Sequence, residues 1–181
     1  MLKVDRAQGV LDWNKLIAYR RGMEVARWHT RKPVFPETVG HHTANVALLC
    51  DILTDGECSK DLLMAALVHD VGEFYTGDLP APVKVDDPEL STRIHDLDAK
   101  YLSRNGITVP FLVENEKNVL RAADIIDLVW TAALELRVGN SDYQEVLERG
   151  IQYLKALQLP NRQQAIVDNI MESIVSDLRT A

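Results

Sequence analysis

The sequence contains few cysteines and no long apolar run. Its 181 residues include two cysteines, Cys50 and Cys58. Their spacing is not that of a CxxC motif, so we interpret both as reduced thiols. The longest apolar run is far shorter than a membrane span, and the segment MLKVDRAQGV at the start has no apolar signal region. These absences predict an intracellular, cytoplasmic protein with no membrane partner.

An excess of positive charge is also missing. The chain carries 20 Lys and Arg residues against 27 Asp and Glu residues, which gives a net charge of −7 and a pI near 5.2. A protein that binds nucleic-acid polymers normally presents a basic surface, so we expect no such partner. A small anionic substrate is compatible with this charge if positive side chains gather locally. The length and the hydrophobic fraction of 46% fit one domain, residues 1–181, with a sizeable core.

Strand patterns and internal repeats are absent as well. Apolar residues recur with helical spacing, and we therefore predict an all-α, single-domain helical bundle. Thr38, Ser59 and Asp87 are expected to cap three helices at their N-termini. Residues 78–82 are expected to form a stiff, proline-rich loop. The predicted helices cover about residues 7–25, 38–53, 59–77, 87–104, 113–138, 142–157 and 160–178.

A polar cluster interrupts the apolar run that begins at Leu62. His69 and Asp70 follow this run directly, and Glu73 comes one helical turn later. If the segment is one continuous helix, His69 and Glu73 lie on the same face. Burying such groups is unfavourable unless they are paired or bind a metal. Because imidazole and carboxylate groups suit Zn, Mn, Co or Fe, the stretch favours a divalent-metal site over a solvated His-Asp pair.

Two further predicted helices supply candidate ligands. His42 falls on the apolar stripe of the second one, where a lone histidine is more often a satisfied core residue. Asp124 and Asp127 share one face of the longest one and have apolar neighbours. With a His-Asp pair elsewhere in the chain, the metal interpretation becomes the better one. The predicted metal ligands are His42, His69, Asp70 and Asp124.

Other side chains are candidates for catalysis and for substrate binding. Glu73 is the expected general acid or base, since a metal would lower the pKa of a bound water. Arg27 and Lys84 are expected to offset charge on phosphate oxygens. Trp28 is expected to pack against a sugar or base. The alternative for the basic run around Trp28 is a solvated connector.

Several polar residues are weaker candidates for a functional site. Lys117 and Arg121 precede the predicted ligand of their helix and are candidates for contacting a longer phosphate chain. His41 points about 100° away from its neighbour His42, so we expect a supporting or surface position. Three more residues are interpreted as solvated polar side chains. They are His95, Asp96 and Asp98.

These residues together resemble a known enzyme family. The order His, His-Asp, Asp matches the HD-domain phosphohydrolases. Specific segments are similar to the YfbR-type 5′-deoxynucleotidases, and the similarity covers half of the chain. The segments are Arg27-Trp28, His42, His69-Asp70-x-x-Glu73, Thr76-Gly77-Asp78-Leu79-Pro80-x-Pro82-x-Lys84 and Ala123-Asp124.

The resemblance implies a fold, an activity and partners. The family is all-α and commonly dimeric, and it hydrolyses phosphate from 2′-deoxynucleotides with Co, Mn or Zn. We therefore expect a homo-oligomer that acts on small deoxynucleotides, purine deoxynucleotides such as dAMP or dATP among them. By position, the resemblance makes the four predicted ligands metal-binding. It makes Glu73 and Asp78 catalytic residues.

The resemblance also assigns substrate contacts. It makes Arg27 a phosphate ligand and Trp28 the selector of deoxyribose. One departure is His41, which stands where the family usually has an acidic residue. If that acidic residue orients a metal ligand, His41 must do something else, such as binding a phosphate.

Other members of the same superfamily are alternatives. The Arg-Trp-His-Thr-Arg segment, residues 27–31, is similar to phage enzymes of the DatZ type, which are dATP triphosphohydrolases that release triphosphate. In that case Thr30 would lie near the purine edge, and the host cytoplasm would be the location. A cyclic-nucleotide or (p)ppGpp hydrolase is a second alternative. A catalytically silent helical interaction module belongs to a different class, and it predicts no bound transition metal.

Overall fold

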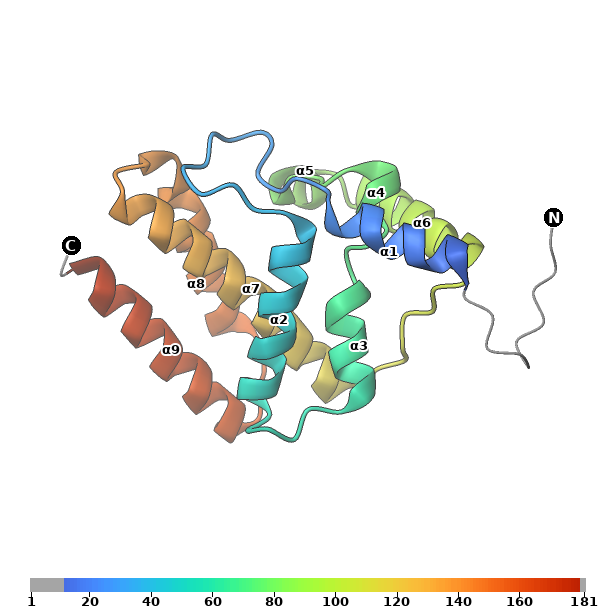
Figure 1. The fold of residues 1–181 in the computed structure, drawn as a ribbon. Coiled ribbons are helices and arrows are strands. Elements are labelled where there is room, and N and C mark those ends of the chain that lie inside the picture. The colour runs from blue at the N-terminus through green and yellow to red at the C-terminus, as the bar shows by residue number, and fades with distance from the viewer. Residues whose placement is uncertain (1–11, 180–181) are drawn as a thin grey trace.

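The described part of the chain, residues 12–179, is built from helices (Figure 1), as a computed structural model shows. Within these residues the backbone forms no strand, only an isolated antiparallel bridge between Ala26 and Thr38. The prediction of an all-α chain is confirmed, while residues 7–11 of the first predicted helix lie outside the described residues. None of the described helices is long and apolar enough to cross a lipid bilayer. The helices are α1 (Trp13–Met23), α2 (Val39–Leu53), α3 (Lys60–Val68), α4 (Glu73–Thr76), α5 (Ala81–Asp86), α6 (Pro88–Arg104), α7 (Glu114–Arg137), the 3₁₀ turn η2 (Ser141–Tyr143), α8 (Gln144–Ala156) and α9 (Asn161–Arg179).

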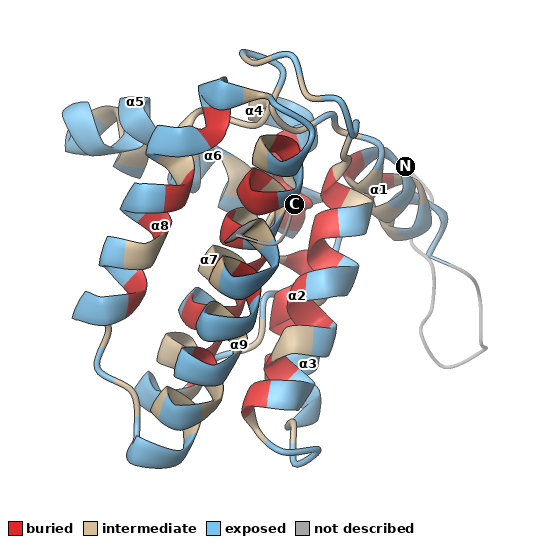
Figure 2. Cartoon of the chain, turned by 90° about the vertical axis from the view of Figure 1, so that its left-hand side faces the viewer, coloured by how far each residue is buried: buried red, intermediate tan, exposed pale blue. Residues whose placement is uncertain are grey.

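Helix α7 is the central element of the larger apolar core. It packs against α2, α3, α8 and α9. In Figure 2 the buried residues line the faces that α2, α3 and α7 turn toward the interior. Small side chains on α7, such as Ala122 and Ala123, are fully buried and let the neighbouring helices approach closely. Side chains from three separate segments can therefore meet between these helices.

A smaller apolar core joins α1, the end of α3 and α6. Its buried members are Ala18, Val68, Val71, Leu102 and Ile107. Two glycines allow backbone segments to pack directly against each other. A Cβ atom on Gly22 would lie 2.7 Å from the Val71 carbonyl oxygen, and one on Gly72 would lie 2.5 Å from Asp98 Cβ. This core therefore fixes the short segment between α3 and α4.

The helix starts predicted from capping residues are confirmed. The side chains of Thr38, Ser59 and Asp87 each accept a hydrogen bond from the backbone N–H three residues later, at 3.5, 3.0 and 2.9 Å. Each of these side chains satisfies a donor that the helix itself leaves free. The bounds of α7 also lie within one residue of the predicted ones.

The third predicted helix, over residues 59–77, is wrong as one continuous element. α3 ends at Val68 and α4 starts at Glu73, with turns between them. In these turns backbone N–H groups bond to carbonyl oxygens three residues earlier rather than four. The cause is the smaller core, which buries Val71 completely and so overrides the local helical pattern. His69 and Glu73 therefore do not share a continuous helical face.

Two proline-containing segments also differ from the prediction. The expected loop over residues 78–82 is partly helical, because α5 starts at Ala81. Pro82 is the second residue of α5, where the missing N–H leaves no helical bond unmade. Pro160 was predicted to open the last helix but precedes it, since α9 starts at Asn161.

Candidate functional site

Two histidine rings lie together where α2 packs against α3. His42 is fully buried on α2, and His69 directly follows the last residue of α3. The ring centroids lie 5.3 Å apart. The Nδ1 of His42 lies 2.7 Å from Asp127 Oδ2, and the Nδ1 of His69 lies 2.7 Å from the Ala66 carbonyl oxygen. Each Nδ1 therefore donates, and the buried Nε2 atoms, which have no hydrogen-bond partner, are left for another ligand.

Two carboxylates complete this arrangement. Oδ1 of Asp124 on α7 lies 3.1 Å from His42 Nε2. Oδ2 of Asp70 lies 3.5 Å from His42 Nε2 and 3.3 Å from His69 Nε2. One ligand atom each from His42, His69 and Asp124 all lie within 4.8 Å of one another. The structure thus brings together the four predicted ligands, here called the His–Asp cluster, from α2, α7 and the turn after α3.

The His–Asp cluster gathers ionised carboxylates around its imidazoles. Burial alone would lower the pKa of His42, but its contacts with Asp124 and Asp127 raise it to about 9. Burial alone would raise the pKa of Asp70, but the two imidazoles and Arg27 hold the pKa of this carboxyl well below its usual range. Metal ligands must shed protons to bind an ion, so a divalent cation would replace protons held here. The donor set has the chemistry of a cation site.

Asp127 belongs to this site, although its role did not follow from the sequence. The residue is 3% exposed, and its carboxylate accepts the hydrogen bond from His42 Nδ1. The available signal was its spacing of three residues from Asp124, which puts both carboxylates on one face of α7. Asp124 contacts Nε2 and Asp127 contacts Nδ1 of the same ring. A carboxylate behind a histidine fixes the orientation and tautomer of its ring.

Glu73 lies beside the cluster as the first residue of α4. It is 5% exposed, and its Oε2 has no hydrogen-bond partner. Its Oε1 lies 3.8 Å from Lys84 Nζ. Burial, and then the charges of Asp70 and Asp78, raise the pKa of Glu73 to about 9. In the chain without a bound ion, this carboxyl is neutral near pH 7 and can exchange a proton with a substrate.

Arg27 joins the cluster to the loop between α1 and α2. Its side chain is 9% exposed, and its Nε lies 3.2 Å from Glu37 Oε2. Its Nη1 donates a hydrogen bond to Asp70 Oδ2 at 3.3 Å. Burial alone would lower the pKa of Arg27, but Asp70, Glu37 and two further carboxylates raise it. A permanent positive charge therefore lies directly beside the predicted ligands.

Trp28 follows Arg27 in an unusual backbone conformation. Its φ angle is 61°, a left-handed value that is uncommon for a residue with a side chain. Oδ2 of Asp78 accepts a hydrogen bond from the Trp28 backbone N–H at 3.2 Å. The indole Nε1 donates to Glu37 Oε2 at 2.9 Å, and the indole and Tyr143 ring centroids lie 5.3 Å apart. Asp78, predicted to be catalytic, thus holds the main chain of the predicted sugar selector.

Three predicted substrate-binding residues have other surroundings. Thr30 is exposed in the turn that follows Trp28. Lys117 Nζ and Arg121 Nη1 lie 3.2 and 3.4 Å from carboxylate oxygens of Glu114, at the start of α7. With a rise of about 1.5 Å per residue, Lys117 is roughly 10 Å along the helix from the predicted ligand Asp124. The observed ion-pair partner of both cations is therefore an acidic residue of their own helix.

The outlying polar residues differ in exposure. His41, His95 and Asp96 are exposed, as expected. Asp98 was predicted to be solvated, and this is wrong: it is only partly exposed, and it accepts a hydrogen bond from Thr76 Oγ1 at 2.6 Å. The reason is the close packing of α6 against the start of α4. This bond ties the end of α4 to α6 and supports the segment that carries Glu73.

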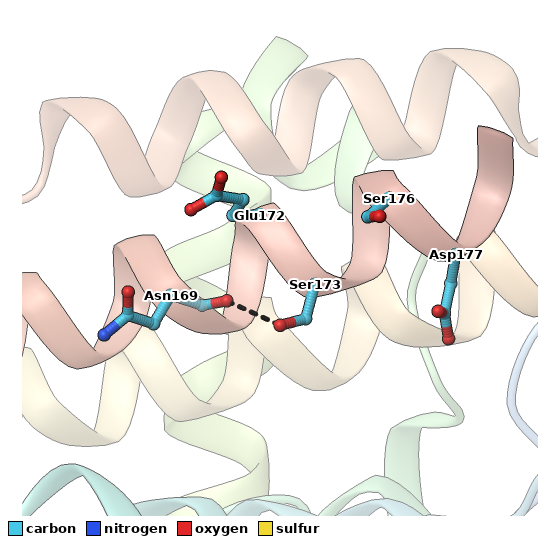
Figure 3. Close-up of a pocket in the computed structure, with 5 residues that line it drawn as sticks. All are labelled: Asn169, Glu172, Ser173, Ser176 and Asp177. Atoms are coloured by element: carbon cyan, nitrogen blue, oxygen red, sulfur yellow. Dashed lines mark hydrogen bonds between the residues drawn. The ribbon is translucent and has the colours of Figure 1, made fainter.

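An open hollow along α9 is a separate feature of the surface (Figure 3). Figure 3 shows the Ser173 hydroxyl donating to the Asn169 carbonyl oxygen within it. The hollow is lined by Asn169, Glu172, Ser173, Ser176 and Asp177. This lining includes two carboxylates and no cationic side chain, so it suits an anionic phosphate poorly. No residue of the His–Asp cluster belongs to the lining.

The sequence matches one protein family over nearly its whole length. The family model of the YfbR-like 5′-deoxynucleotidases matches residues 15–177. The chain belongs to this family. The matched region contains the complete His–Asp cluster together with Arg27, Trp28 and Glu73. The family consists of hydrolases, so the chain is an enzyme, and the alternative of a catalytically silent interaction module is not supported.

Individual relatives agree with the family. The chain is similar to the 5′-deoxynucleotidase of Vibrio atlanticus, with 26% identity over 148 residues that cover 69% of this chain and 76% of that relative. It is also similar to the 5′-deoxynucleotidase of Vibrio parahaemolyticus, with 28% identity over 141 residues that cover 66% of this chain and 73% of that relative.

Solved structures share the fold. An HD-domain phosphohydrolase from Listeria innocua matches with a TM-score of 0.71 and 18% identity, over 92% of this chain and 88% of that one. The HD phosphohydrolase DatZ of cyanophage S-2L, solved with dA and one catalytic Zn²⁺ ion, matches with a TM-score of 0.64 and 19% identity. That match covers 99% of this chain and 100% of DatZ. The predicted HD-type helical fold is confirmed.

Proposed function

We propose that the protein releases phosphate from 2′-deoxynucleotides in a reaction that requires a divalent metal ion. One observation carries this proposal: two imidazoles, each with a buried Nε2 atom that has no hydrogen-bond partner, converge on the carboxylates of Asp70 and Asp124. Unpartnered buried polar atoms are unfavourable, so this donor set fits an ion better than a purely structural role. Membership of the 5′-deoxynucleotidase family supports the substrate class.

The proposed ion would be held by the His–Asp cluster. Nitrogen and oxygen donors in this mixture suit Zn, Mn and Co. The one catalytic Zn²⁺ of DatZ supports a single ion here. When bound, the ion would supply Lewis-acid polarisation of a phosphate oxygen and a lower pKa for water. Asp127 and the Ala66 carbonyl oxygen hold the two imidazoles in place for it.

The neighbouring side chains would act on the substrate itself. Arg27 binds a phosphate oxygen through its guanidinium and offsets the charge that develops there. Glu37 holds this guanidinium from the loop side, at 3.2 Å. When the oxygen of water bonds to phosphorus, the bond from phosphorus to the 5′ oxygen of the nucleoside breaks, and the released phosphate keeps the protons of that water. Glu73, a buried carboxyl beside the cluster, gives its proton to that leaving oxygen as general acid, and Lys84 adds a second positive charge nearby.

Trp28 is the proposed contact for the sugar. Its ring packs against Tyr143, and its indole N–H is bound by Glu37, so the position of the ring is fixed. A fixed ring placed against the C2′ atom leaves no room for a 2′ hydroxyl group. Steric exclusion of this kind gives a physical reason for selecting deoxyribose over ribose.

A dATP triphosphohydrolase of the DatZ type is the second candidate. It is favoured by the fold match, which spans 99% of this chain and all of DatZ. In that reaction Lys84, Lys117 and Arg121 would contact the phosphate chain, and Thr30 the purine. The monophosphate activity stands first because Glu114 already engages two of these cations. A homo-oligomer in the cytoplasm stays a prediction.

The test is product analysis with dAMP, AMP, dATP and dGTP in Co²⁺ or Mn²⁺, resolved by chromatography. Inorganic phosphate from dAMP, with AMP untouched, is the expected result. Deoxyadenosine and triphosphate from dATP would favour the second candidate instead. If metal-loaded protein releases neither product from any deoxynucleotide, the proposed function is wrong.

A further inference from the structure

Glu135 is a fully buried carboxylate for which the proposed reaction has no use. It lies near the C-terminal end of α7. Its Oε1 accepts a hydrogen bond from the Phe35 backbone N–H at 2.8 Å, and its Oε2 accepts one from the Val34 backbone N–H at 2.9 Å. The Nδ2 of Asn140 donates to Oε2 at 2.7 Å. Hydrogen bonds to a carboxylate are stronger than those between neutral groups, so these three bonds hold Glu135 and its donors together strongly.

These donors keep Glu135 ionised. Burial alone would raise the pKa of Glu135, but the bonds from Val34, Phe35 and Asn140 lower it. The carboxylate therefore holds its charge, and its hold on the two N–H groups, across the neutral pH range. A buried charge with fewer partners would be strongly unfavourable, which explains why all three donors converge on one side chain.

Glu135 contacts the loop of residues 27–38, which carries Arg27 and Trp28. The neck of this loop closes on itself, since the Arg27 N–H donates to the Glu37 carbonyl oxygen at 3.0 Å. The two N–H groups bound by Glu135 belong to the returning half of the loop. This half is thereby attached to α7, the helix that also supplies Asp124 to the His–Asp cluster.

Neighbouring contacts extend this anchor along the loop. The Nδ2 of Asn140 also donates to the Lys32 carbonyl oxygen at 3.1 Å. The Arg31 guanidinium carbon lies 5.6 Å from the centroid of the Tyr143 ring. The same Tyr143 ring packs against Trp28. The end of α7 and the following turn η2 therefore form one continuous support for the loop.

We infer that Glu135 is a positioning residue for the substrate. By holding residues 27–38 against the end of α7, it sets where Arg27 meets the phosphate and where Trp28 meets the sugar. This inference rests on the proposed function. The carboxylate of Glu135 bonds to the loop and to Asn140. The loop reaches the predicted metal ligands through Arg27, which donates to Asp70, whereas the ligands themselves belong to α2, α7 and the turn after α3. Loss of the anchor therefore changes substrate discrimination and leaves metal binding in place.

The test is Glu135→Gln, which keeps the size of the side chain and puts a donor group where an acceptor oxygen lies. We expect the ratio of kcat/KM for dAMP to that for AMP to fall by about tenfold or more, with a higher KM for dAMP. The reason is that Arg27 and Trp28 would be displaced from the phosphate and the sugar. Amide hydrogen exchange at residues 34 and 35 becomes faster, and the affinity for Co²⁺ is unchanged. Glu148→Gln, an exposed glutamate on α8, is the matched control and alters none of these quantities.

A folded Glu135→Gln variant with wild-type discrimination and wild-type amide exchange would overturn the inference. A loss of Co²⁺ affinity as large as the loss of discrimination between dAMP and AMP would also overturn it, because it would indicate general damage to the fold. Asn140→Ala removes a single donor and gives the same changes at smaller size, so it takes over if Glu135→Gln does not fold. If the wild-type protein releases no phosphate from dAMP, the proposed function is wrong and the effect on selectivity cannot occur. Amide hydrogen exchange at residues 34 and 35 still decides whether Glu135 anchors the loop.

Discussion

At the scale of single residues, the two imidazoles of the His–Asp cluster are held from behind by different acceptors. His69 donates to a backbone carbonyl oxygen, whereas His42 donates to the carboxylate of Asp127. A carboxylate in this position makes the other ring nitrogen a better electron-pair donor than a carbonyl does. Asp127 is therefore the outer residue whose removal should affect an ion most.

Asp127→Ala is expected to lower the affinity for Co²⁺ by roughly 10- to 100-fold, the usual loss when a group behind a metal-binding histidine is removed. Isothermal titration calorimetry of the metal-free protein measures this. Asp168→Ala, at an exposed aspartate on α9, is the control and should bind Co²⁺ like the wild type. Unchanged affinity in a folded Asp127→Ala variant would show that His42 needs no such support.

Glu73→Gln is expected to separate activity from stability. Activity should fall by about 10²- to 10⁴-fold, the range for loss of a general acid. The pKa of Glu73 is raised from 4.5 to about 9, so the unfolded chain ionises this group first and folding must return the proton. That penalty is absent below pH 4.5, grows with rising pH up to about 9, and does not exist for glutamine.

Chemical denaturation of chelated protein between pH 4 and pH 9 tests this. The free energy of unfolding of Glu73→Gln should exceed that of the wild type by an amount that increases with pH. Glu148→Gln should track the wild type at every pH. A difference that stays constant, or that shrinks as pH rises, would mean that Glu73 does not titrate as described.

The residues of the candidate site were accessible from the sequence to different degrees. His42 and Asp124 could be selected because polar groups on apolar helical faces need partners. The bond between Asp127 and His42 could not be predicted in this way, since it depends on how α2 approaches α7. Glu135 gives no local signal either, because one more charged residue on a long helix is usually a solvated one. The metal-binding and catalytic roles themselves stay predictions.

At the scale of elements, the break between α3 and α4 decides where Asp70 and Glu73 lie. The chain leaves α3 at His69, turns through Gly72 and re-enters a helix at Glu73. Gly72 has φ −62° and ψ −24°, so its backbone is open to any residue and only its surroundings require glycine. Those surroundings are the backbone and side chain of Asp98 on α6.

Gly72→Ala is expected to destabilise the fold by about 1–3 kcal/mol and to weaken Co²⁺ binding, because the new Cβ would overlap Asp98 and displace the turn that carries Asp70. Thermal unfolding and calorimetry measure the two effects. Gly150→Ala is the matched control, since its Cβ would lie 2.5 Å from Val129 Cγ2, within the packing of α8 on α7. It should lose stability and keep its metal affinity. Equal losses of affinity in both variants would contradict a local effect.

Elements were predictable where their cause is local. The starts of α2, α3 and α6 follow from Thr38, Ser59 and Asp87, whose capping bonds span three residues. The break after Val68 was missed because its cause lies in contacts with α1 and α6, which are distant in sequence. Helical periodicity alone continues through that point.

At the scale of the whole molecule, the His–Asp cluster lies where the two apolar cores meet. In the sequence, His69 and Asp70 lie between Val68 and Val71, which belong to the smaller core. Asp124 lies on α7 among residues of the larger core. An ion shared by these side chains would therefore join the two cores and oppose their separation.

Metal binding is expected to raise the melting temperature. An ion that binds only the folded chain adds about 2.7 kcal/mol at a free concentration of one hundred times its Kd. Differential scanning calorimetry over a series of Co²⁺ concentrations should show a continuous rise for the wild type. His42→Ala should show little response. A melting temperature that does not depend on Co²⁺ or on a chelator would contradict a folded-state metal site.

The most direct measurement is phosphate release from dAMP as Co²⁺ is added back to metal-free protein. We predict no release before addition, a rise that saturates at one ion per chain, and no release from AMP under the same conditions. His69→Ala should stay inactive at every Co²⁺ concentration while keeping the helical circular-dichroism spectrum of the wild type. Release in the presence of excess chelator, or equal release from AMP and dAMP, would contradict a metal-dependent deoxynucleotidase.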